Sequence, residues 1–244
     1  MIRQIDAKSS LPEFVDDILL GYLTGMYEAY GIFQGFLRFY LDDYGALIAV
    51  MDGVATVRCG ASSYEEIACF LGTLPELRAV RTDRWFAEYL CSIWKQAPEF
   101  RPVMRCDLSV QPVGETRSAS PREVYPLLAS VFPDFPPVEE WYLDVSYRMR
   151  HGFCRNCAIW EGDTPAASAM TVAEWQSGAV IGAVATAEEH RRKGYASVCV
   201  TALTEQLQRE GKQVFICPKN AGAQRIYESI GFTVCGEMAW IERK

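Results

Sequence analysis

The sequence predicts a mixed α/β (α+β) protein with a mostly antiparallel sheet flanked by helices and a second, smaller α/β domain at its N-terminal end. Apolar runs broken by two-residue turns at 157–187 are typical of adjacent antiparallel strands. The helical spacing of apolar residues at 195–210, followed by a strand and another helix, adds covering helices. A Pro-, Ser- and Gly-rich segment at 95–122 separates the halves, and 244 residues suit one large or two small domains.

The composition is that of a packed globular protein. Half of the residues are hydrophobic and 23% are charged, which predicts a core and not disorder. The formal net charge of -7 argues against a broad nucleic-acid surface. No apolar run reaches the roughly 18 residues of a membrane span, and acids interrupt the N-terminal stretch where a signal peptide would be apolar. We therefore expect a cytoplasmic protein that binds neither nucleic acid nor membrane. The sequence does not determine its oligomeric state.

The nine cysteines fit a reducing compartment. Most of them lie in apolar runs, as Cys69, Cys199 and Cys217 do, and we expect reduced, buried thiols. Cys154 and Cys157 form a CxxC pair, but no second pair or nearby histidine completes a zinc site. The pair also leads into a strand-like run, whereas a redox CxxC opens a helix. We expect it to have neither a metal-binding nor a redox role.

The first half contains alternating strands and helices. The helix at 11–25 rests on the spacing of Leu11, Phe14, Val15, Ile18 and Leu19. The other expected elements are three strands within 35–60, a helix with a serine cap at 62–74, a strand at 77–82 and a helix at 83–94.

The second half continues in the same manner. We expect a first strand at 103–110, helices at 121–132 and 138–153 around a proline break, and strands at 157–163, 166–175 and 179–187. A helix at 195–210 ends at Gly211, and a strand at 212–219 precedes a helix within 220–232. The domains are accordingly predicted at 1–100 and 101–244.

A basic loop joins the strand at 179–187 to the helix at 195–210. Its sequence from Arg191 to Ala196 is R-x-x-G-x-A, and Gly194 allows backbone conformations that other residues avoid. Backbone amides at the positive end of the helix would then converge on phosphate oxygens. Arg191, Arg192 and Lys193 would add positive charge. The plain alternative is a helix start with exposed charges.

A second motif makes the pattern resemble a known family. NAGAQRIYESIGF places Asn220, Ala223, Tyr227, Gly231 and Phe232 at the spacing N-x-x-A-x-x-x-Y-x-x-x-G-F. Together with the loop, it resembles the GNAT superfamily of N-acetyltransferases over roughly 103–244. Without that resemblance, Asn220 is simply a good helix cap and Tyr227 a core aromatic.

The resemblance implies an acetyl-CoA-dependent transferase that acts on a primary amine of a small molecule or a peptide. The residues that it places at coenzyme A are Val184, Ala185, Thr186, Arg191, Arg192, Lys193, Gly194, Tyr195, Ala196, Ser197, Asn220, Ala223 and Tyr227.

The chemistry implied is direct attack of a neutral amine on the thioester, with no covalent enzyme intermediate. A backbone N–H at or next to Val184 would stabilise the oxyanion, and Tyr227 would protonate the departing thiolate. The strand at 179–187 carries no carboxylate, so Glu174 on the preceding strand is the nearest candidate base. Deprotonation by water is the other possibility. The acyl group could also be longer than acetyl.

The first half repeats the order strand–helix–strand–helix but lacks the basic loop, because CGASSYEE contains no R-x-x-G-x-A. It is either a degenerate copy of the same fold or an unrelated α/β cap that shapes the acceptor site. A functional alternative for the whole chain is a coenzyme A-binding sensor or scaffold with little or no turnover.

Overall fold

The computed structural model describes residues 1–5, 17–32 and 35–243. Its contacts divide the chain into two compact units, Met1–Val103 with Gly236–Lys244, and Met104–Cys235. The last residues thus belong to the first unit. The predicted domains at 1–100 and 101–244 stay a prediction. Among the described residues, no helix is long and apolar enough to cross a membrane.

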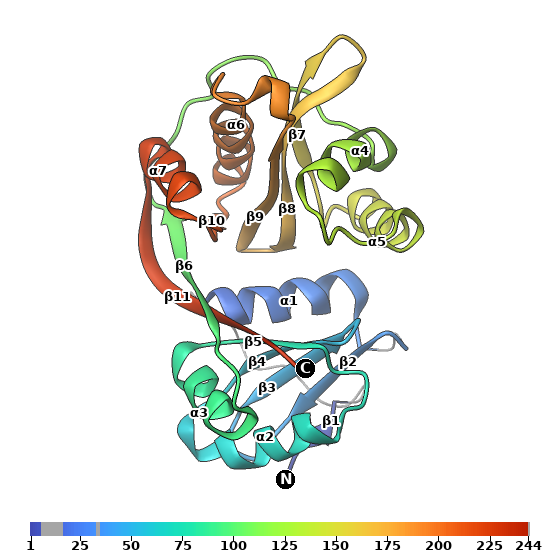
Figure 1. Ribbon diagram of the computed structural model, residues 1–244, viewed down its shortest axis with the longest axis vertical. Helices are drawn as coiled ribbons and strands as arrows, with labels where there is room; N and C mark the ends of the chain where they lie inside the picture. The colour runs from blue at the N-terminus through green and yellow to red at the C-terminus, as the bar shows by residue number, and fades with distance from the viewer. Residues whose placement is uncertain (6–16, 33–34, 244) are drawn as a thin grey trace. The chain divides into compact units, whose positions relative to one another are not determined.

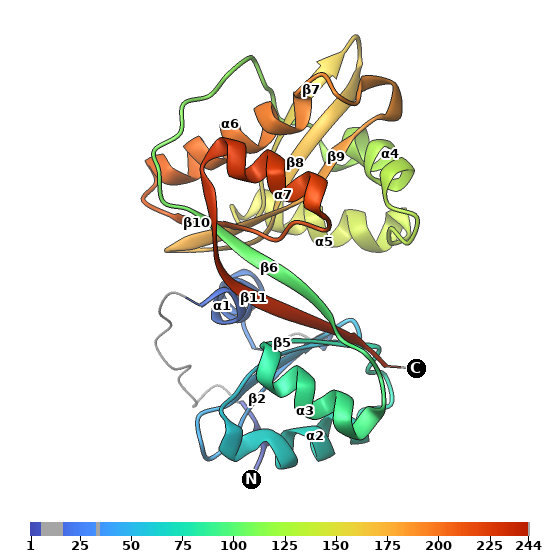
Figure 2. The same ribbon diagram turned by 60° about the vertical axis from the view of Figure 1, so that its left-hand side comes forward.

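The first unit is a sheet with helices on both faces. Its elements are β1 (Arg3–Gln4), α1 (Ile18–Tyr30), β2 (Leu37–Leu41), β3 (Leu47–Met51), β4 (Val54–Arg58), α2 (Tyr64–Thr73), β5 (Ala79–Thr82) and α3 (Arg84–Trp94). The strand order is β1-β2-β3-β4-β5-β11, where β11 (Phe232–Glu242) returns from the end of the chain. α2 and α3 cover one face and α1 lies against the other (Figure 1, Figure 2).

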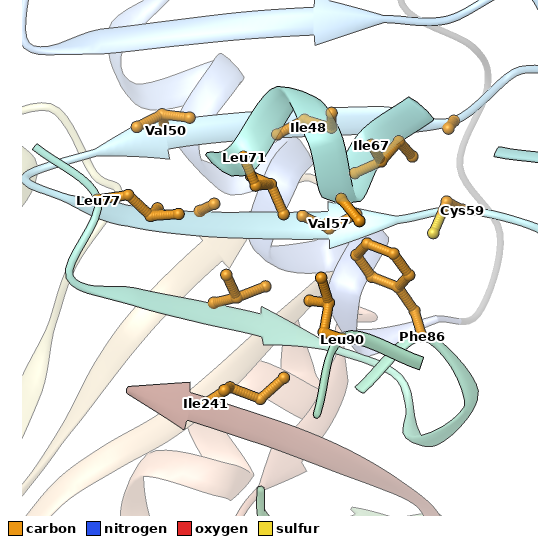
Figure 3. Packing of buried hydrophobic residues seen from close by; sticks show 14 of the residues in the cluster. Ile48, Val50, Val57, Cys59, Ile67, Leu71, Leu77, Phe86, Leu90 and Ile241 are labelled. Carbon is orange, nitrogen blue, oxygen red and sulfur yellow. The ribbon is translucent and has the colours of Figure 1, made fainter. Parts of the chain in front are cut away.

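The strands of the first unit pair as the turn signals predict. β2, β3 and β4 form an antiparallel meander, and β5 is parallel to β4. Figure 3 shows the core between this sheet and its two helices, where Val57 lies close to Leu71 of α2 and Leu90 of α3. Ile241 of β11 belongs to the same core. The strands at 35–60 and 77–82 and the helices at 62–74 and 83–94 are therefore confirmed.

Two details of the first unit differ from the predictions. α1 starts after its N-cap Asp17, whose Oδ1 accepts a hydrogen bond from the Leu19 N–H at 2.8 Å, and it continues to Tyr30. The expected helix residues 11–16 lie outside the described part of the chain. The predicted serine occupies the N-cap position of α2, but Ser63 also ends a short 3-10 helix, Ala61–Ser63, and its side chain makes no capping hydrogen bond.

The second unit carries the expected, mostly antiparallel sheet. Its elements are the last residues of β6 (Glu99–Cys106), α4 (Pro121–Val131), α5 (Val138–Arg150), β7 (Asn156–Glu161), β8 (Thr164–Trp175), β9 (Gly178–Thr186), α6 (Tyr195–Arg209), β10 (Gln213–Ile216) and α7 (Ala221–Ile230). The strand order is β6-β10-β9-β8-β7, and only the β9–β10 pair is parallel. α4 and α5 cover one face of this sheet, and α6 and α7 cover the other (Figure 1).

Local signals explain where the helices of the second unit begin and end. Ser120 and Glu123 form a capping box at the start of α4, where proline occupies the first turn. Gly211 follows α6 with φ 76°, so the predicted glycine stop is confirmed. The strand predicted at 103–110 instead runs from Glu99 to Cys106. An apolar pattern over so few residues predicts that a strand exists more reliably than it predicts where the strand starts and ends.

The cysteines are free thiols, but they are less uniformly buried than expected. Cys154, Cys157 and Cys199 are buried, whereas Cys217 is half-buried and Cys69 is exposed. The prediction for Cys69 was therefore wrong, because this residue lies on the outer side of the amphipathic helix α2.

Candidate functional site

The second unit has a parting between its two parallel strands. β9 pairs with β10 from Gly178 to Ile181, and β10 ends there at Ile216. β9 continues to Thr186 and stays paired with β8 on its other edge. Within the described part of the chain, residues 182–186 therefore have one edge of backbone N–H and C=O groups without a neighbouring strand. The predicted residues Val184, Ala185 and Thr186 lie on this edge.

A β-bulge lies at the same place. Ser168 of β8 faces Ala185, but Met170, two residues on, faces Gly182, so β9 has one residue more than β8 over this interval. Ala183 within the bulge has φ 47°, a left-handed conformation that is unusual for a residue other than glycine. A bulge turns peptide groups out of the regular ladder. The bulge therefore changes the direction of the peptide groups next to Val184, where the family resemblance implies an oxyanion donor.

The basic loop follows directly and has the shape of an anion-binding turn. Arg192 and Gly194 have φ 64° and 80°, and Gly194 is the N-cap of α6. No side chain caps this helix, so its first amides lack a side-chain acceptor. A Cβ at Gly194 would meet nothing within 4 Å, and residues 191–194 are exposed. The fifteen-residue helix α6 presents its positive dipole end to this open space.

Side chains around the loop contact one another. The Tyr195 hydroxyl donates a hydrogen bond to Oε1 of Glu161 at 2.5 Å, and this bond is the main reason that the pKa of Glu161 is lowered. Lys193 Nζ lies 3.0 Å from Nδ1 of His190. The rings of His190 and Tyr195 stack with their centroids 6.1 Å apart.

α7 places the residues of the second motif. The Asn220 side chain accepts a hydrogen bond from the Ala223 N–H at 2.9 Å, so Asn220 is the helix cap that its residue type predicts. Tyr227, one turn after Ala223, is buried and packs against Phe232 at a centroid distance of 6.2 Å. Burial raises the pKa of Tyr227 to about 12. Val184, Ala223 and Tyr227 all border one apolar cluster on the α6 and α7 face of the sheet.

Comparisons with known proteins agree with this geometry. Residues 157–241 match the family model of FR47-like proteins. A GCN5-related N-acetyltransferase from Kribbella flavida superposes with a TM-score of 0.68 at 13% identity, over 93% of this chain and 94% of that chain. A GNAT-family acetyltransferase from Colwellia psychrerythraea gives 0.62 at 15% identity over the whole of both chains. The chain has the GNAT fold.

A third GNAT structure is a tandem protein from the clavulanic acid biosynthesis pathway, solved without AcCoA. It superposes with a TM-score of 0.56 at 12% identity, over 91% of this chain and 88% of that chain. No curated protein sequence matches the chain significantly. At these low sequence identities, the structural similarity establishes the GNAT fold and nothing about the chemistry of this chain.

Glu174 lies away from the bulge of β9, and its carboxylate takes part in ion pairs. Its side chain is buried, and Oε1 is 2.5 Å from Arg155 Nη2 and 3.7 Å from Lys212 Nζ. Glu174 faces Ala179 near the start of β9, and at about 3.3 Å per residue the bulge at Val184 is roughly 17 Å farther along the strand. This carboxylate, the candidate base named from the sequence, is paired with two cations.

Two features of the site leave no signal in the sequence. The bulge depends on the register between β8 and β9, which apolar patterning alone does not encode. The Glu161–Tyr195 contact joins residues that are far apart in sequence, on β7 and at the start of α6. The exposed side chains of Arg191, Arg192 and Lys193 lie on the loop as expected.

Proposed function

We propose that the protein binds acetyl-CoA in its second unit and transfers the acetyl group to a primary amine. One observation carries the proposal: β9 parts from β10 after Ile181 and leads into a left-handed loop and an uncapped helix start. The parting offers backbone groups to an extended amide-containing chain. The loop offers amides and positive charge to phosphates. Pantetheine and pyrophosphate occur in that order in coenzyme A.

In this proposal, residues of the second unit contact coenzyme A along the whole length of the cofactor. Backbone amides of 192–197 would hold the pyrophosphate, with Arg191, Arg192 and Lys193 adding charge at the rim. Residues 184–186 would hydrogen-bond the pantetheine arm as a neighbouring strand does. Asn220 and Ala223 at the start of α7 would line its other side.

The cofactor supplies an acetyl thioester, and this chain supplies positioning, an oxyanion donor and help for the departing sulfur. The amine would attack in its neutral form, and a backbone N–H beside Val184, in the bulge, would stabilise the negative charge that develops on the carbonyl oxygen. With a pKa of about 12, Tyr227 keeps its proton at neutral pH. Because a thiol has a pKa of about 8.5, this phenol acts chiefly as a hydrogen-bond donor to the thiolate.

Glu174 is not part of the proposed machinery, because its carboxylate is already paired with Arg155 and Lys212. We propose that water removes the proton from the incoming amine. The rate then follows the neutral fraction of the amine and rises with pH toward the acceptor's own pKa.

We further propose that the first unit is a degenerate copy of the second. Both contain an antiparallel meander, a helix, a strand parallel to the last meander strand, and another helix. A structural neighbour described as a tandem GNAT protein suits this proposal. Counted from their caps Asp83 and Asn220, Phe86 of α3 corresponds to Ala223 of α7, and Leu90 corresponds to Tyr227.

Among its described residues, the first unit lacks the features by which the second unit is proposed to hold coenzyme A. Thr82 Oγ1 donates a hydrogen bond to the Val57 carbonyl at 3.0 Å, which keeps the ends of β4 and β5 together. Phe86 is fully buried in the core near Cys59 at the end of β4 (Figure 3). At the start of α2, Glu66 accepts a hydrogen bond from the Ile2 N–H at 2.9 Å, so acidic charge occupies this helix end.

A screen tests the proposed function. Free-thiol release from acetyl-CoA is measured with polyamines, amino acids, aminoglycosides and peptides as acceptors, beside calorimetric titration with coenzyme A. Thiol release that depends on one acceptor class, together with an acetylated product, supports the transferase. Tight coenzyme A binding without transfer to any amine would favour the sensor or scaffold, and no binding would reject both.

A further inference from the structure

We propose that Glu161 is a positioning residue that holds the coenzyme A loop in its binding conformation through the hydroxyl of Tyr195. The inference rests on the proposed function for the identity of the ligand, but the contact itself is a property of the free protein. Glu161 lies at the end of β7, outside both motifs that indicate coenzyme A binding.

The loop needs an external contact to hold its shape. It contains two left-handed residues, Arg192 and Gly194, and the first of them is not a glycine. Such conformations persist when the surrounding structure fixes them. The start of α6 has no side-chain cap that would do so locally. The hydrogen bond from Tyr195, the first residue of α6, to Glu161 is therefore placed to restrain the turn.

The partner of this bond is held on a hairpin. Glu161 pairs with Thr164 across the turn that joins β7 to β8, so its backbone is fixed by two strands. This gives the carboxylate a defined position beside the helix start. By contrast, an acceptor on the loop itself would move together with it.

Charge alone does not explain why an acid lies here. A carboxylate beside a phosphate site repels the ligand, and its removal would then strengthen binding. The positive charge of Lys193 acts on Glu161 and reduces this repulsion. Positioning and repulsion thus predict opposite effects of the same substitution.

Calorimetric titration with coenzyme A distinguishes these effects. Glu161→Ala should weaken coenzyme A binding on the order of three- to tenfold, the scale of one solvent-exposed, charge-assisted hydrogen bond. Glu161→Gln keeps an acceptor for the Tyr195 hydroxyl and should restore most of the affinity. Tyr195→Phe should weaken binding to a similar degree, and the double variant Glu161→Ala with Tyr195→Phe should be no worse than either single variant.

Asp163, at the tip of the same hairpin, provides a matched charge control. Asp163→Asn removes the same charge nearby and should leave the affinity unchanged. Tighter binding by both Glu161→Ala and Glu161→Gln, with Tyr195→Phe unaffected, would overturn the positioning role and leave repulsion as the effect of Glu161.

Hydrogen exchange tests the contact without any ligand. In the free protein, Glu161→Ala and Tyr195→Phe should each speed exchange of the amides of residues 192–198, while those of β8 keep their protection. This readout separates the positioning role of Glu161 from the proposed function of the protein. If the unsubstituted protein binds no coenzyme A, only the proposed function is rejected. Unchanged exchange of the loop amides in both variants rejects the positioning role.

Discussion

Tyr227 packs in the core, and the proposed chemistry also uses its hydroxyl. Its ring packs in the cluster under α6 and α7, and burial holds its pKa near 12. We expect Tyr227→Phe to reduce turnover by about 10²–10³, the usual effect of losing one hydrogen-bond donor to charge that develops in the transition state. Coenzyme A affinity should change little, because the hydroxyl acts after attack has begun. Steady-state thiol release with the best acceptor, beside a thermal melt, provides the measurement.

Phenylalanine is the appropriate replacement because it keeps the ring. Tyr227→Ala would also open a cavity in the core and would confuse lost chemistry with lost stability. Native turnover in Tyr227→Phe would leave the tyrosine as a packing residue, and water would then protonate the thiolate.

Buried thiols predict a loss of stability at alkaline pH. Burial raises the pKa of Cys199 from 9.0 to about 12, so the folded state holds a proton that the unfolded state releases. Its stabilising effect is complete below about pH 9 and is lost as the pH rises toward 12. We expect the urea midpoint of the unsubstituted protein to fall between pH 8 and pH 10.5, and to fall less steeply in Cys199→Ala.

Cys69 supplies the control for that measurement because its side chain is exposed. Cys69→Ala should show the same decline with pH as the unsubstituted protein. Equal pH dependence in all three proteins would show that ionisation of Cys199 is not coupled to unfolding.

At the scale of elements, strong periodicity of apolar residues correctly predicted which segments form helices and which form strands. The strands of both meanders and the helix at 195–210 follow directly from apolar spacing and turn residues. The ends of the elements were predicted less accurately. The prediction missed the start of β6 because Glu99, Phe100 and Arg101 show no clear alternation of apolar and polar residues. Contacts between distant elements, such as Arg155 with Glu174, leave no trace in the local pattern.

Gly194 and Gly211 lie at the two ends of α6 and allow a matched test of the loop. Both have positive φ, 80° and 76°, and a Cβ at either position would meet nothing within 4 Å. Valine at either position should cost about 1–2 kcal/mol of backbone strain. Only Gly194→Val should abolish coenzyme A binding, because its side chain would enter the space of the pyrophosphate. Calorimetry and thermal melts measure both quantities.

Near-native affinity in Gly194→Val would remove the phosphate-binding assignment of the loop. Equal loss of affinity in Gly211→Val would instead trace the effect to a destabilised helix.

For the whole molecule, the proposed repeat relation predicts one cofactor per chain. The first unit has Phe86 and Leu90 where the second has Ala223 and Tyr227, and its helix start carries Glu65 and Glu66 in place of a basic loop. Titration of the full chain with coenzyme A should saturate at one equivalent. In Gly194→Val the same titration should show no binding at all. A ratio near two, or a site that survives this substitution, would show that both units bind the cofactor.

The candidate site was predictable where it consists of contiguous motifs. The loop and α7 carry their signals in residue type and spacing, so their residues could be named from the sequence. Glu174 was chosen by its distance along the chain, and sequence proximity does not reveal which ion pair a carboxylate joins. Glu161 was missed for the same reason, since its partner follows two strands later.

The return of the chain to the first unit has a consequence for its synthesis. β5 pairs with β11 through residues 79–82 and 239–242, and Ala239 and Ile241 complete the core around Leu90. A ribosome completes this strand only after it has synthesised all of the second unit. Until then the nascent first unit exposes a sheet edge and an unfinished core, a state prone to mispairing. Chaperone dependence and aggregation of prematurely terminated chains would arise from that delay.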